Sequence, residues 1–110
     1  MKKTPTGAIL FVRAKSGLSE DELERRLLER KPRFLEVPGL RQKIYGRDKA
    51  SGAVCGIYFF KSPAALAAFR ESELAKTIAT AYEVVEFRAE AYELLYPLRP
   101  ESSPWSQSGG

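Results

Sequence analysis

The sequence reads Phe34-Leu-Glu-Val-Pro-Gly-Leu40, then, after a short polar run, Val54-Cys-Gly-Ile-Tyr-Phe-Phe60, and then Ser62-Pro-Ala-Ala-Leu-Ala-Ala-Phe69. In the first stretch, the Pro-Gly pair indicates a turn that leads into a strand. The second is a nearly continuous apolar run, which is typical of a strand in the middle of a sheet. The third opens with Ser-Pro, the preferred N-cap and first residue of a helix. Together they predict a strand, a hairpin, a buried strand and a helix that packs on it.

The first half of the chain predicts one strand and one helix. Residues 8–12 form a short β-type run in which apolar side chains occupy both faces. Ser19 and Glu22 have the spacing of a capping box, in which Glu22 reaches back to the Ser19 amide. We therefore expect a helix at about 19–31, ended by Pro32.

The second half predicts three strands, at about 40–47, 53–61 and 84–95, and two helices, at about 63–71 and 73–79. The alternation of the last strand changes near Ala91 or Tyr92, which indicates a bulge there. This order predicts an α+β, ferredoxin-like βαββαβ fold, a four-stranded antiparallel sheet with its helices on one face. We expect residues 1–98 to form this domain and 99–110, rich in Ser, Pro and Gly, to be a flexible tail.

Composition excludes several kinds of site. The chain has no histidine, no asparagine and a single cysteine, Cys55, so we expect no metal site and no Ser-His or Cys-His nucleophile. Its formal net charge of +4 is spread along the sequence rather than clustered. No apolar run reaches the length of a membrane span, and no signal-peptide pattern follows Met1, so a cytoplasmic location is expected.

The sheet face without helices has two interpretations. Phe11 and Phe59 could stack RNA bases, as in an RNA-recognition motif. That motif needs a basic residue and an aromatic residue where this chain has Cys55 and Ile57, so nucleic-acid binding is the less favoured prediction. Alternatively, the face is covered by a partner sheet, which would bury its apolar side chains.

Over residues 8–98 the chain resembles the YdhR-like branch of the dimeric α/β-barrel superfamily. The resemblance rests on Pro38-Gly39 before the second strand, Gly56-Ile-Tyr-Phe-Phe60, Ala64-Ala-Leu-Ala-Ala-Phe69, and Glu83-Val-Val85 to Pro97-Leu98. It implies a homodimer that presses two bare sheet faces together, with a small ligand between sheet and helices. It also implies a monooxygenase that uses neither metal nor flavin, on an apolar or aromatic substrate. An isomerase or cyclase using the same pocket is the alternative enzyme, and a ligand- or RNA-binding module is the non-enzymatic alternative.

Better-studied monooxygenases of this superfamily use Asn, Trp or His, whereas the only tryptophan here is Trp105 in the tail. Tyrosines are the available substitutes, since Tyr45, Tyr58, Tyr82 and Tyr92 could donate hydrogen bonds to a carbonyl or enolate, and we expect Tyr58 and Tyr45 to be the catalytic residues. A core or interface position with a polar tip is the alternative for the same side chains. The predicted ligand pocket comprises Phe34, Phe60, Leu66, Phe69, Tyr82 and Tyr92. The predicted dimer interface comprises Ile9, Phe11, Arg13, Glu86, Arg88 and Glu90. No cofactor and no metal are expected.

Overall fold

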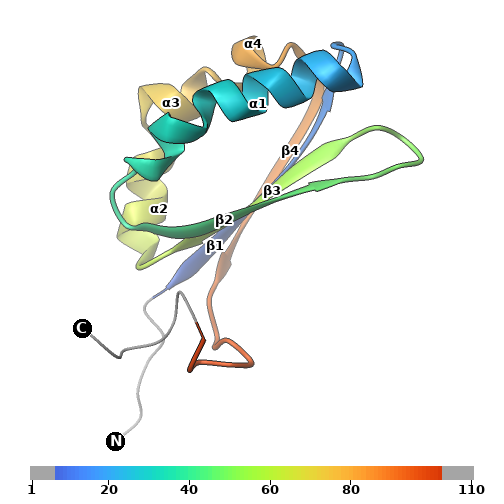
Figure 1. The fold of residues 1–110 in the computed structure, drawn as a ribbon. Coiled ribbons are helices and arrows are strands. Elements are labelled where there is room, and N and C mark those ends of the chain that lie inside the picture. Colours follow the sequence, from blue (N-terminus) through green and yellow to red (C-terminus); the bar gives the residue numbers. More distant parts are fainter. Residues whose placement is uncertain (1–6, 103–110) are drawn as a thin grey trace, which may run out of the picture.

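A computed structural model describes residues 7–102 of the protein, and its fold is the one that the sequence predicts (Figure 1). The strands are β1 (Ala8–Ser16), β2 (Leu40–Arg47), β3 (Val54–Phe60) and β4 (Val84–Glu93), and the helices are α1 (Glu20–Leu35), α2 (Pro63–Arg70), α3 (Glu73–Lys76) and α4 (Ile78–Ala81). The strands pair in the order β2-β3-β1-β4, and every pair is antiparallel. All the helices lie on one face of the sheet, and the β2–β3 hairpin projects beyond them (Figure 1).

Helix α1 runs further than predicted, because Pro32 lies inside it and the helix ends only at Leu35. The missing Pro32 amide costs one backbone hydrogen bond. Continuing the helix places Phe34 in the core, where it is buried, and this packing offsets the loss. At the other end, the Ser19 hydroxyl accepts from the Glu22 amide as expected. The Glu22 carboxylate does not reach back, because Arg25 and Arg26 bind it.

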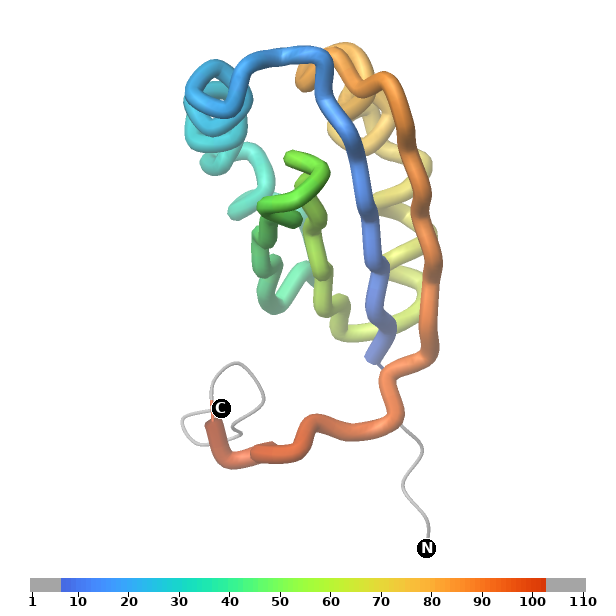
Figure 2. Tube along the Cα trace, turned by 90° about the vertical axis from the view of Figure 1, so that its right-hand side faces the viewer, coloured from blue at the N-terminus to red at the C-terminus, as the bar shows by residue number. Residues whose placement is uncertain are grey.

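The bulge lies at the opposite end of β4 from the predicted position. Register between β1 and β4 is regular through Ala91 and Tyr92 and shifts only at Lys15 and Ser16, opposite the start of β4. The change of alternation has a different cause, since Tyr92 stays on the bare face and donates its hydroxyl proton to Glu90. Figure 2 shows β1 and β4 running side by side, after which the chain turns away beneath the sheet.

The core between sheet and helices is built around four aromatic rings. Phe34 from α1, Tyr58 and Phe60 from β3, and Phe69 from α2 lie 5.2 to 6.3 Å apart between ring centroids in the contacting pairs. Such pairs stabilise a core beyond the area that they bury. Alternate residues of β1 complete the sheet side of this core: Ala8, Leu10, Val12 and Ala14.

The Pro-Gly turn before β2 brings backbone close to α2. Gly39 has φ +79°, and a Cβ built on it would lie 2.6 Å from the Ala65 Cβ. Gly52 in the hairpin has a similar φ of +81° but no atom within 4 Å of such a Cβ. A side chain at Gly52 would therefore cause backbone strain alone, whereas a side chain at Gly39 would cause backbone strain and a clash with Ala65.

We expect Gly39→Ala to destabilise the protein by about 2–4 kcal/mol and Gly52→Ala by only about 1 kcal/mol. Both variants bear the cost of a positive φ, but only the first forces Ala65 to move. Urea unfolding of both variants measures the difference directly. Equal losses would mean that α2 shifts freely away from the turn.

The opposite face of the sheet carries no helix, and it gathers the residues predicted as a dimer interface. Ile9, Phe11 and Arg13 lie there on β1, opposite Phe59, Ile57 and Cys55 of β3. On β4 the same face carries Glu86, Arg88, Glu90 and Tyr92. Arg13 bonds Asp48 of the hairpin at 3.5 Å, while Arg88 bonds Glu90 at 3.2 Å. These ion pairs form two separate groups rather than one network, because Arg13 lies opposite the like-charged Arg88 in the register.

Residues 94–102 follow β4 without forming a helix or strand, and Trp105 lies outside the described residues. The division into a domain at 1–98 and a tail at 99–110 stays a prediction. Within residues 7–102, no helix is long and apolar enough to cross a membrane.

Candidate active site

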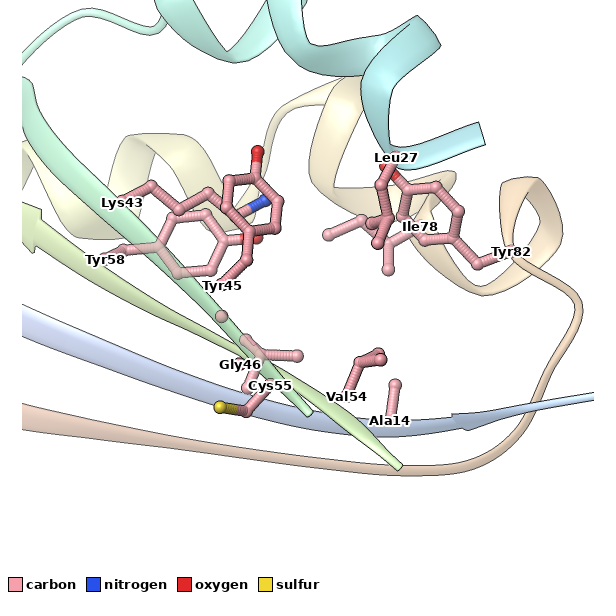
Figure 3. Close-up of a pocket in the computed structure, with 12 residues that line it drawn as sticks. Ala14, Leu27, Lys43, Tyr45, Gly46, Val54, Cys55, Tyr58, Ile78 and Tyr82 are labelled. Carbon is pink, nitrogen blue, oxygen red and sulfur yellow. The ribbon is translucent and has the colours of Figure 1, made fainter. Parts of the chain in front are cut away.

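A cleft opens between the sheet and the helices, at the end near the β2–β3 hairpin (Figure 3). Its floor is made of small sheet residues, including Ala14, Val54 and Gly56, and its roof of Leu27, Ile78 and Tyr82. Lys43, Tyr45 and Tyr58 form the wall at one end (Figure 3). The enclosed space is about 50 Å³, and its walls are almost entirely apolar.

Lys43 occupies the centre of the end wall, and sequence reasoning missed it. Its Nζ lies 3.5 Å from the ring centroid of Phe34, 4.4 Å from that of Tyr45 and 4.6 Å from that of Tyr58. The strand register explains this placement, because Lys43 lies opposite Tyr58 on the helix-covered face, next but one to Tyr45. The signal in the sequence was the alternation of β2, which puts Lys43 on the same side as a predicted catalytic tyrosine.

The absence of a counter-ion makes this lysine unusual. Among residues 7–102, no carboxylate lies within 4.0 Å of the Lys43 ammonium or of the nearby Arg30 guanidinium in an ion pair. Burial, with a smaller contribution from the Arg30 charge, lowers the pKa of Lys43 to about 7. The ring faces act in the other direction, since they favour the ammonium form. A substantial fraction of neutral amine is therefore present at neutral pH.

The three cleft tyrosines stay protonated in the physiological range. Burial raises the pKa of Tyr58 far above its usual range, and it raises the pKa of Tyr45 and of Tyr82 as well. Each is thus a neutral hydroxyl that can donate to an oxygen. The Tyr82 hydroxyl is buried without a hydrogen-bond partner of good geometry, although the Arg30 guanidinium lies 5.5 Å above its ring.

Gly56 has no side chain, and this leaves space for the side chains of Lys43 and Tyr58. A Cβ there would lie 3.2 Å from both the Lys43 Cε and the Tyr58 Cε1. Cys55 lines the cleft through its backbone, because its sulfur points to the other face of the sheet (Figure 3). A reactive thiol therefore does not belong to this site.

The predicted catalytic and pocket residues lie in three places: the cleft, the hydrophobic core and the bare face of the sheet. Tyr45, Tyr58 and Tyr82 line the cleft, and Phe34 contacts it through the Lys43 ammonium. Phe60, Leu66 and Phe69 lie in the hydrophobic core instead of in the cleft wall.

The placement of Tyr92 in the pocket is wrong. Tyr92 pairs with Ile9 on the bare face and is 51% exposed. Its large apolar ring suggested a pocket position, but strand alternation turns it away from the helices. No group of three potential metal ligands exists within residues 7–102.

The lowered pKa of Lys43 predicts how stability changes with pH. In the unfolded chain this lysine has its ordinary pKa, about 10.4, against about 7 when folded. Between these values the unfolded chain binds more protons, so the free energy of unfolding rises with pH, by at most about 1.4 kcal/mol per unit from this group. Above about pH 10 the trend reverses, because the buried tyrosines have raised pKa values and the folded chain then binds more protons.

Urea unfolding of the wild type and Lys43→Met between about pH 6 and 9.5 tests this. We expect the variant to be the more stable of the two near pH 6, with the difference shrinking as the pH rises. Parallel curves would contradict a lowered pKa.

Comparison with known proteins yields structural neighbours only. No family model matches the sequence, and no curated protein matches it. SnoaB, a cofactor-independent oxygenase from Streptomyces nogalater, matches with a TM-score of 0.70 and 14% identity, over 84% of this chain and 97% of that one. A candidate antibiotic biosynthesis monooxygenase from Nitrosomonas europaea matches with a TM-score of 0.70 and 14% identity, over 88% and 98% of the two chains.

A third neighbour is the hydroxynitrile lyase from Passiflora edulis, with a TM-score of 0.67 and 15% identity, over 84% of this chain and 99% of that one. Several of the structural neighbours are candidate antibiotic biosynthesis monooxygenases, and the fold that they share with SnoaB and the lyase is the fold of this chain. At these identities the likeness concerns the fold alone. The finer YdhR-like assignment stays a prediction.

Proposed function

We propose that this protein binds a small aromatic molecule in the cleft, removes a proton from its acidic hydroxyl or enol, and passes the anion to dioxygen without a cofactor. The observation that carries the proposal is the Lys43 amine, held against three aromatic rings with no ion-pair partner among the described residues. The cofactor-independent oxygenase among the structural neighbours supports the choice of reaction.

The residues divide the work. Neutral Lys43 takes the proton, and a base with a pKa near the working pH is the most effective one. The ammonium that forms and the hydroxyl of Tyr45 or Tyr58 then stabilise the anion on the ligand oxygen. Apolar walls exclude water from the reacting centre.

The size of the cleft limits how a substrate enters. An enclosed volume of about 50 Å³ holds only the leading edge of an aromatic ring. Tyr45, 41% exposed, lies at the mouth, so the rest of the molecule would lie beside it in the open part. We therefore expect a flat ligand that enters edge-on with its oxygen toward Lys43.

The proposed oxidation needs only the substrate and dioxygen. A methylene that is conjugated with a carbonyl, directly or through an aromatic ring, loses two hydrogens and becomes a ketone, while dioxygen supplies the ketone oxygen and leaves its other atom as water. All four electrons come from the substrate, so no external reductant is needed. Without dioxygen, returning the proton to another carbon would be an isomerisation, which is the second candidate.

Two measurements test this function. The first follows the colour of a nitrophenol bound to the protein, which reports ionisation alone; we expect its apparent pKa to fall on binding. The second measures oxygen uptake and ¹⁸O incorporation with anthrone, whose enol is a phenol, against its uncatalysed autoxidation. Ionisation without oxygen uptake would favour the isomerase. If neither ionisation nor oxygen uptake is observed, the proposal is refuted.

We also propose that the bare sheet face is buried in a homodimer. Apolar side chains run along its centre, including Ile9, Phe11 and Ile57, and charged residues of β4 lie at one side. This arrangement of an apolar centre and a polar rim is typical of protein interfaces.

A further inference from the structure

We propose that Lys43 is also a nucleophile, and that it forms an imine with small aromatic aldehydes that enter the cleft. This activity goes beyond the proposed oxygenation, although both use the same amine. It would make the cleft a covalent binding site for carbonyl compounds.

The first step of the argument is the environment of the amine. Lys43 lines the cleft, and its Nζ has no ion-pair partner among the described residues, so no salt bridge has to break before it reacts. The groups around it are the rings of Phe34, Tyr45 and Tyr58. A lysine becomes nucleophilic when it is desolvated by apolar groups and lies near another cation, and Arg30 is that cation here.

The second step is room for the aldehyde. The leading edge of an aromatic ring can enter between the small floor residues and the roof, so that a carbonyl carried on that edge faces Lys43. The lysine stem is flexible, so Nζ can turn from the ring faces toward the cleft. A second cavity of about 160 Å³, between α1 and β2, also borders Lys43 and Tyr45 and gives the stem space to move.

The third step is the chemistry, which balances without a further reactant. The neutral amine attacks the carbonyl carbon, a C–N bond forms, and the carbonyl oxygen becomes a hydroxyl. That hydroxyl then leaves as water and a C=N bond remains. The water contains the former carbonyl oxygen and the two hydrogens of the amine. Tyr45 or Tyr58, both protonated, can donate to the carbonyl oxygen and to the departing hydroxyl.

The other lysines of the chain serve as an internal comparison. Lys31, Lys49 and Lys76 are exposed to solvent, whereas Lys43 is half-buried with its ammonium against three aromatic rings. The chain's α-amino group, with an ordinary pKa of about 8, is the other amine expected to react. It is distinguished from Lys43 by peptide mapping.

The test incubates the folded protein at neutral pH with benzaldehyde and cyanoborohydride, which reduces an imine to a stable benzylamine. Mass spectrometry of the peptides then gives the rate at each amine. We expect Lys43 to be labelled on the order of 100-fold faster than Lys49 or Lys76. Lys43→Arg removes this label, Lys49→Arg leaves it unchanged, and unfolding in urea abolishes the selectivity.

Equal labelling of Lys43 and the exposed lysines in the folded wild type would overturn the proposal. Tyr58→Phe supplies a second measurement, since it keeps the amine and its apolar surroundings while removing a donor; we expect slower labelling with the same selectivity. The nitrophenol measurement separates the two proposals. Ionisation of the nitrophenol without selective labelling would leave Lys43 a base only, and selective labelling without ionisation would remove the proposed function but not the imine.

Discussion

Replacing Lys43 by methionine is expected to lower kcat/KM by a factor of 10² to 10⁴ and to leave the fold intact. That range is typical for the loss of a general base. Methionine keeps much of the stem's length and apolar surface, so the contacts with Phe34 and Tyr58 persist. It also removes a half-buried ammonium that has no counter-ion, so we expect no loss of stability.

The pH profile identifies the role of the lysine. In the wild type, kcat/KM should rise with pH through about 7, as Lys43 becomes neutral. Lys43→Met should lose this dependence, and Lys43→Arg should be equally inactive because arginine stays protonated. Tyr45→Phe is the milder control, since it removes a hydrogen-bond donor and keeps the base. An active Lys43→Met variant with an unchanged profile would move the base to another residue.

Substituting Phe11 by glutamate is expected to convert a dimer into a monomer. Phe11 lies at the centre of the bare face, opposite Ile57 on β3 and Glu90 on β4. In a two-fold symmetric interface the change acts twice, removing two aromatic contacts and adding two charges beside an acidic residue. We expect Kd to rise by on the order of 100-fold or more, which corresponds to roughly 3 kcal/mol.

Light scattering at low and high protein concentration measures the effect. Leu28→Glu is the matched control, because Leu28 is 62% exposed on α1, in the layer of helices, and the same change there should leave the mass unaltered. A wild-type protein that stays monomeric at all concentrations would contradict the proposed homodimer. Binding of single-stranded RNA to Phe11 and Phe59 would then become the next assay.

Local patterns were enough to predict the elements and their order. The Ser19 cap, the Ser62-Pro63 start of α2, the Pro38-Gly39 turn and the apolar run at 54–60 each depend on neighbours a few residues away. Such signals act through backbone geometry and side-chain alternation, which the sequence displays directly. Pro32 misled, because the burial of Phe34 outweighs its cost, and the change of alternation in β4 misled as well, because the register stays regular there.

The sequence by itself determined a ferredoxin-like domain, the absence of histidine chemistry, and which side chains share a strand face. Only the tertiary structure decided that Lys43 faces inward, that three rings lie against its Nζ, and that no carboxylate within residues 7–102 pairs with it. The physical reason is that the pKa of a lysine depends on desolvation and on charges from other elements, here α1 and β3, which are distant in sequence. The position of Tyr92 could not be predicted for a similar reason. Its ring suits either face of the sheet, and the pairing of β1 with β4 places it on the bare face.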